Sequence, residues 1–180
     1  SDIPKKFKKN DITISAITGL SGLEPTLQFI KVSKKILLAN KESIVCGWDI
    51  INKIAKKYKT KIAPIDSEHF SIQELLNNYN KDEIEKIYIT ASGGPFLNLP
   101  KKNFKNIKPA DAIKHPKWKM GKKISVDSAT LMNKILELIE AYKLFPFEKN
   151  KIEIIIHPQS LVHAINKLKN GITKFIYHEP

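Results

Sequence analysis

Three absences limit the kind of protein this chain can be. It has one cysteine, Cys46, no arginine, and no apolar run long enough to cross a membrane. A lone cysteine excludes an internal disulfide, which fits a reducing compartment. Its neighbours Ile44 and Val45 predict a buried thiol and not a nucleophile. The start of the chain, residues 1–6, lacks the apolar core of a signal peptide, so we expect a soluble protein that makes no membrane contact.

The charge is strongly one-sided. Against 18 acidic residues stand 31 basic ones, all lysine, which gives a formal net charge of +13. Such a charge favours polyanions, but proteins that read bases rely on the planar arginine fork, which lysine does not reproduce. We therefore expect no nucleic-acid partner and a field that attracts small anionic substrates and cofactors. A non-catalytic phosphate- or nucleic-acid-binding module is kept as the alternative function.

Short apolar runs alternate with helical patterns, which is typical of an α/β protein. In the first third we expect strands at residues 12–17, 35–39 and 61–65, with helices entered near Pro25 and after Ser43. Such alternation predicts a mainly parallel sheet with ligand sites at the carboxyl ends of its strands. The elements expected after these are a helix at 71–78, a strand at 84–90, a long helix at 128–145, a strand at 152–156, and a hairpin of 161–165 with 173–177 closed by a two-residue Asn-Gly turn.

Carboxylates at two places suggest a metal site. Asp66 and Glu68 follow the third strand on what we expect to be a loop, and carboxylate oxygens are the ligands that Mg²⁺ and Mn²⁺ prefer. Glu137 on the long helix shares a face with Asn133 and lies three residues after Lys134. It would be a third ligand, beside an ammonium and an amide that grip a phosphate. The alternatives are solvated loop charge and a surface ion pair.

Three further positions could bind an anion. Ser92 precedes two glycines at a strand end and offers a hydroxyl near backbone N–H groups. Ser128 stands where the long helix is expected to begin, either as an N-cap or beside a phosphate at the positive end of the helix dipole. His115 lies in a lysine-rich stretch with Trp118 and Met120, and that composition suits a mobile lid over residues 115–121.

Six segments, in this order, resemble the 1-deoxy-D-xylulose 5-phosphate reductoisomerase family. They are LANKES (38–43), PIDSEH (64–69), ASGGPF (91–96), HPKWKMG (115–121), SVDSATLMNK (125–134) and HPQS (157–160). The resemblance implies an enzyme of non-mevalonate isoprenoid biosynthesis that depends on NADPH and on Mg²⁺, Mn²⁺ or Co²⁺. Such enzymes rearrange and reduce 1-deoxy-D-xylulose 5-phosphate to 2-C-methyl-D-erythritol 4-phosphate.

The resemblance also implies a role for each matching residue. The implied metal ligands are Asp66, Glu68 and Glu137, which with His115 form the catalytic group. The implied substrate contacts are Ser67, Glu68, Ser92, His115, Ser128, Asn133, Lys134 and Glu137. The implied cofactor-lining residues are Asn40, Lys41, Glu42 and Gly121, and Trp118 and Met120 match the lid.

By the same resemblance, the chain lacks the family's N-terminal glycine-rich β-α unit and its C-terminal helical domain. We therefore expect the second half of a Rossmann-like nucleotide-binding domain over residues 1–65, followed by an incomplete α+β catalytic domain over residues 66–180. Alone, this piece is expected to bind NADPH poorly and to be inactive. The family implies a homodimer formed through the hairpin, located in the bacterial cytoplasm or in a plastid-type organelle.

Overall fold

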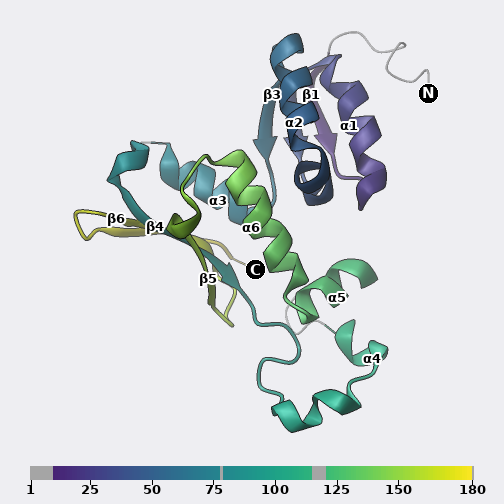
Figure 1. Cartoon of the computed structure of the whole chain (residues 1–180), viewed down its shortest axis with the longest axis vertical. Helices are drawn as coiled ribbons and strands as arrows, with labels where there is room; N and C mark the ends of the chain where they lie inside the picture. Colours follow the sequence, from purple (N-terminus) through teal and green to yellow (C-terminus); the bar gives the residue numbers. More distant parts are fainter. Residues whose placement is uncertain (1–9, 78, 115–120, 180) are drawn as a thin grey trace. The chain divides into compact units, whose positions relative to one another are not determined.

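The computed structural model describes residues 10–77, 79–114 and 121–179 (Figure 1). The chain divides into two compact units. Unit 1 comprises residues 1–70 and 139–146, and unit 2 comprises residues 71–138 and 147–180. The architecture is α/β, as expected, with one sheet in each unit. The domain border expected after residue 65 stays a prediction.

Unit 1 contains a three-stranded parallel sheet in the order β1-β2-β3. Two helices fill the connections between its strands (Figure 1), as a right-handed β-α-β path requires. Its elements are β1 (Asn10–Ser15), η2 (Leu20–Gly22), α1 (Leu23–Ile30), β2 (Ser33–Leu38), α2 (Lys41–Tyr58) and β3 (Lys61–Pro64). The expected strands and helices of this part are thus confirmed, with bounds that differ by at most three residues.

The core of unit 1 consists of aliphatic side chains from β2 and its two flanking helices. Leu27 and Ile30 come from α1, and Ile36 from β2 is fully buried against them. Ile44 and Ile51 lie seven residues apart on α2, so they share the helix face that packs on this cluster. The amphipathic pattern of α2 therefore fixes which of its faces meets the sheet.

Asn40 determines where α2 begins. Its side-chain oxygen accepts the Ser43 N–H at 2.6 Å, which caps the helix. The same amide donates to the carbonyls of Ile17 and Gly19, after the first strand. Gly22 leaves room for this arrangement, because a Cβ there would lie 3.0 Å from the Asn40 amide nitrogen and still closer to the Ile17 carbonyl. One buried side chain thus ties the ends of β1 and β2 together.

Unit 2 contains a four-stranded mixed sheet in the order β5-β4-β6-β7. The strands are β4 (Ile84–Ala91), β5 (Ile152–Ile156), β6 (Val162–Leu168) and β7 (Thr173–Tyr177). β4 pairs parallel with β5 and antiparallel with β6. The expected strands and the hairpin are confirmed. The hairpin loop is longer than expected, since the Leu168 N–H bonds the Ile172 carbonyl across three residues, with Gly171 at φ 88°.

The remaining helices follow β3 along the chain, and two of them, α3 and α6, contribute residues to both units. They are α3 (Ser67–Leu76), η3 (Lys81–Glu83), η4 (Lys101–Asn106), α4 (Pro109–Ala112), α5 (Lys122–Ala129), α6 (Met132–Leu144) and η5 (Lys149–Lys151). Among the described residues, no helix is both long enough and apolar enough to cross a membrane.

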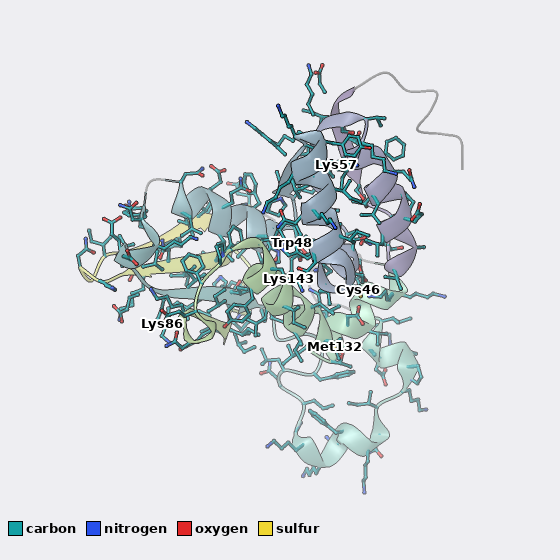
Figure 2. All side chains as sticks on the ribbon, turned by 45° about the horizontal axis from the view of Figure 1, so that its top comes forward. Cys46, Trp48, Lys57, Lys86, Met132 and Lys143 are labelled. Atoms are coloured by element: carbon teal, nitrogen blue, oxygen red, sulfur yellow. The ribbon has the colours of Figure 1, made fainter. Side chains whose placement is uncertain are left out.

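Three expectations about local structure are wrong. The helix expected at 71–78 begins at Ser67, so Glu68 is helical, whereas Asp66 lies in the two-residue connection between β3 and α3. The single helix expected at 128–145 is two helices, α5 and α6, separated by Thr130 and Leu131. Cys46 is exposed on α2 and not buried (Figure 2), because Ile44, and not Cys46, faces the core.

The first prediction concerns Asn40. Replacing it with alanine removes the helix cap and the bridge to two carbonyls, so the free energy of unfolding should fall by about 2 kcal/mol. Asn40→Ser keeps a cap acceptor and should recover about half of that loss. Urea unfolding of the chain measures both. Asn52→Ala, in the middle of α2, is the matched control, and a loss at Asn40→Ala no larger than at Asn52→Ala would contradict the proposed role.

Candidate metal and anion site

In unit 1, the expected metal ligand Asp66 lies beside Lys41. The Lys41 Nζ is 2.7 Å from the Asp66 carboxylate, and both side chains are mostly buried. β2 and β3 are adjacent parallel strands, so the residues that follow them meet at one edge of the sheet. The contact therefore joins two of the sequence motifs, one assigned to the cofactor and one to the metal. Their spacing along the chain did not predict it.

Ser67 and Glu68 occupy the first turn of α3. The Ser67 hydroxyl donates to the Glu68 carboxylate at 2.7 Å, and Glu68 is 8% exposed. An acidic side chain in a first helical turn is stabilised by the positive end of the helix dipole. Glu68 thus places a largely buried carboxylate in the first turn of α3, a donor that suits a cation.

Two further residues in unit 1 could bind a cation, and neither was predicted as a ligand, although His69 ends the PIDSEH segment. His69 and Glu140 are both fully buried, and the His69 Nδ1 is 3.4 Å from a Glu140 oxygen. Ligand atoms of Asp66, His69 and Glu140 all lie within 4.8 Å of one another. His69 also stacks on Phe145, with ring centroids 6.4 Å apart. Helical spacing could have identified Glu140 as a candidate ligand, because it follows Glu137 by three residues on α6.

The residues assigned to the cofactor differ in what the structure shows of them. The Asn40 side chain is 3% exposed and engaged in the cap, and its amide lies 3.4 Å from the Glu42 carboxylate. Gly121 is exposed and is the N-cap residue of α5. A cofactor contact by these residues and by Lys41 stays a prediction. His115, Trp118 and Met120, with most of the expected lid at 115–121, lie outside the described residues.

In unit 2, Glu137 is the buried centre of a polar group on α6. It is 1% exposed, its carboxylate lies 2.5 Å from the Lys134 Nζ, and Asn133 donates to it at 2.5 Å. The interpretation as a surface ion pair is wrong, since Lys134 is only 7% exposed. A buried ion pair with an added hydrogen bond is the arrangement that a buried carboxylate requires.

The strand-end loops of unit 2 meet the last turn of α5. β4 and β5 end side by side, and the Gly94 N–H bonds the Ser92 hydroxyl at 3.3 Å just beyond. Gly94 has φ 68°, and a Cβ there would lie 2.9 Å from the Ser128 carbonyl. Gly94, two residues after Ser92, thus packs against Ser128. Ser128 lies in the last turn of α5, so its placement at the start of the long helix is wrong.

The fold and these residues define a class: an α/β protein with carboxylates after one parallel strand of unit 1, which could bind a divalent cation, and an ammonium-amide group on a helix of unit 2, which could bind an anion. Two family models match the chain. One is the C-terminal domain of 1-deoxy-D-xylulose 5-phosphate reductoisomerase, over residues 62–145, and the other is 1-deoxy-D-xylulose 5-phosphate reductoisomerase, over residues 5–47. The chain belongs to the 1-deoxy-D-xylulose 5-phosphate reductoisomerase family.

Curated relatives carry that name. The protein of Pelagibacter ubique is 57% identical over 171 residues, which cover 95% of this chain and 44% of that protein. The protein of Treponema denticola is 52% identical over 163 residues, covering 91% of this chain and 43% of that protein. The chain thus spans less than half the length of these relatives.

Solved structures agree in fold. A reductoisomerase in complex with NADPH, fosmidomycin and magnesium has a TM-score of 0.90 and 41% identity, over 99% of this chain and 46% of that one. The Zymomonas mobilis enzyme in complex with NADPH has a TM-score of 0.84 and 40% identity, over 96% of this chain and 44% of that one. These likenesses do not favour the alternative of a non-catalytic phosphate- or nucleic-acid-binding module.

The second prediction tests the close approach at Gly94. Gly94→Ala should lower the free energy of unfolding by about 2–4 kcal/mol, because the new methyl group is strained at positive φ and also collides with the Ser128 carbonyl. Gly171→Ala is the matched control, with φ 88° and nothing within 4 Å, and should cost about 1 kcal/mol. Urea unfolding measures both variants. Equal losses would show that α5 does not constrain the loop.

Proposed function

We propose that a protein of the relatives' full length containing this chain converts 1-deoxy-D-xylulose 5-phosphate to 2-C-methyl-D-erythritol 4-phosphate with NADPH. The observation that carries the proposal is the set of buried acidic, ammonium and amide groups at the positions where the family motifs occur. The neighbours solved with NADPH and magnesium support both cofactors. The bacterial relatives support a bacterial cytoplasmic enzyme.

Asp66, Glu68 and Glu137 are the proposed metal ligands. Their donor set, carboxylate oxygens alone, fits Mg²⁺ or Mn²⁺. The assignment follows from the resemblance to the reductoisomerase family. When bound, the cation supplies a Lewis acid that polarises the substrate carbonyl. The three carboxylates would hold it, and Lys41, 2.7 Å from Asp66, balances the charge of that carboxylate.

The substrate phosphate is assigned to the unit 2 group. Lys134 offers an ammonium and Asn133 an amide, while Ser92 and Ser128 offer hydroxyls from the neighbouring loop and helix. Binding energy from this end of the substrate orients the reacting carbons. NADPH supplies the hydride for the reduction. The remaining roles follow from the family motifs. The proposed contacts to NADPH come from Asn40, Lys41, Glu42 and Gly121. Ser67 and His115 are proposed to contact the substrate, and Trp118 and Met120 to form the lid.

The third prediction tests the metal ligands in the full-length protein. Glu68→Gln and Glu137→Gln keep the shape of each side chain and remove its charge, so magnesium-dependent NADPH oxidation should fall by about 100-fold or more. The half-saturating magnesium concentration should rise in parallel. Glu148→Gln, at an exposed site, is the matched control and should match the wild type. Near-normal turnover in both test variants would refute the metal assignment.

A homodimer is proposed from the open face of the unit 2 sheet. Tyr88, Ile165 and Phe175 form a row across β4, β6 and β7. Asn166 points to the opposite face, where its amide reaches the Leu75 carbonyl of α3 at 3.5 Å. The row is therefore on the face away from α3, and Phe175 is 58% exposed. A second copy of the same face would bury these side chains.

Ion pairs border the row. Lys86 pairs with Glu153, and Glu85 accepts a hydrogen bond from Lys167 at 2.6 Å, which raises the pKa of that ammonium. A polar rim around an apolar centre is the usual composition of a protein interface.

The fourth prediction concerns this face. Phe175→Glu places a charge at the centre of the proposed interface, so the full-length protein should become monomeric in sedimentation equilibrium, while the wild type has twice the monomer mass. The control is Phe104→Glu, since Phe104 is 49% exposed but lies in η4 and not in the sheet. A dimer that persists in Phe175→Glu would contradict the assignment of the interface.

A further inference from the structure

Two residues, Thr130 and Leu131, join α5 to α6, and the backbone of Leu131 is left-handed. Leu131 has φ 60° and is 40% exposed, so tight packing of its side chain does not account for the conformation. A leucine rarely adopts this region, which glycine and asparagine occupy more easily. A bulky residue held there requires neighbours that hold the backbone in place.

The hydrogen bonds around Leu131 show what the conformation does. Its N–H donates to the Ser128 carbonyl at 3.1 Å, which closes the end of α5. Its own carbonyl accepts the N–H groups of Lys134 at 3.1 Å and Ile135 at 3.2 Å, which begins α6. Leu131 is therefore both the residue that ends one helix and the residue that starts the next.

A right-handed backbone at Leu131 would continue α5 into α6 as a single helix. Asn133 and Lys134 would then project in other directions relative to Ser128. With the left-handed residue in place, the chain turns between Ser128 and Asn133, which are only five residues apart. The loop after β4 supports the turn from outside, because Gly94 lies against the Ser128 carbonyl.

We propose that Leu131 is a positioning residue, whose left-handed backbone sets Asn133 and Lys134 against Ser128 so that the three side chains bind one phosphate group. The inference rests on the proposed function, which assigns the phosphate to these residues. It concerns backbone conformation alone, so the leucine side chain itself has no part in binding.

The test compares three variants of the full-length protein. Leu131→Gly accepts positive φ without strain, whereas Leu131→Ile adds a β-branched side chain that resists it. Met132→Ile is the matched control, because Met132 is the neighbouring residue (Figure 2), 45% exposed, and already right-handed in α6. Calorimetric titration with 1-deoxy-D-xylulose 5-phosphate in the presence of Mg²⁺ gives the dissociation constants. Steady-state kinetics gives KM for both substrates.

Leu131→Ile should bind the sugar phosphate about tenfold more weakly, while Leu131→Gly and Met132→Ile stay within about twofold of the wild type. Its KM for the sugar phosphate should rise and its KM for NADPH should not. A purely structural role would instead reduce the folded fraction, lowering kcat with both KM values unchanged. Wild-type affinity in Leu131→Ile, or equal losses in the glycine and isoleucine variants, would overturn the inference.

The proposed function can fail separately. If the wild type neither binds nor turns over 1-deoxy-D-xylulose 5-phosphate, that function is refuted. Inorganic phosphate titrated into the same four proteins then decides the positioning inference. The order expected is the same, with Leu131→Ile weakest, and equal affinities for phosphate would overturn it.

Discussion

The burial of Glu137 is the constraint on which the site depends. A carboxylate at 1% exposure is stable only if its charge is compensated, and the compensation comes from Lys134 and Asn133 on the same helix. These residues cannot separate, because three- and four-residue spacings share one face of α6. The same contacts give the lysine and the amide fixed positions before any ligand arrives. In the proposed function, this buried group is the place prepared for the cation and the phosphate.

Backbone conformation at two residues fixes the end of α5, which side-chain charge alone does not do. Gly94 and Leu131 both have positive φ, and each acts on the last turn of α5, one by close approach and the other by ending the helix. In unit 1 the equivalent task falls to Asn40, whose single amide joins the end of β1 to the start of α2. In both units, the strand ends are held by specific local contacts and not by the hydrophobic core alone.

Much of the fold followed from the sequence, because apolar runs of strand length and helical spacing are local signals. The β1 to β3 region and the hairpin were predicted on that basis. The break at Leu131 was not, since leucine is a strong helix former and nothing around it signals a left-handed residue. Contacts between elements could not be predicted from the sequence either. Lys41 contacts Asp66 only because two strands are adjacent, and His69 contacts Glu140, which lies more than seventy residues away along the chain. The candidate ligands came from motifs, while their burial and pairing required the structure.

The most direct test of the metal assignment is the location of a bound ion. Crystals of the full-length protein soaked with Mn²⁺, measured at the manganese absorption edge, give an anomalous difference map that marks the metal without reference to the protein. The account predicts one strong peak about 2.1 Å from carboxylate oxygens of Asp66, Glu68 and Glu137. A peak coordinated by His69 and Glu140 in their place, or no peak at these carboxylates at saturating Mn²⁺, would contradict it.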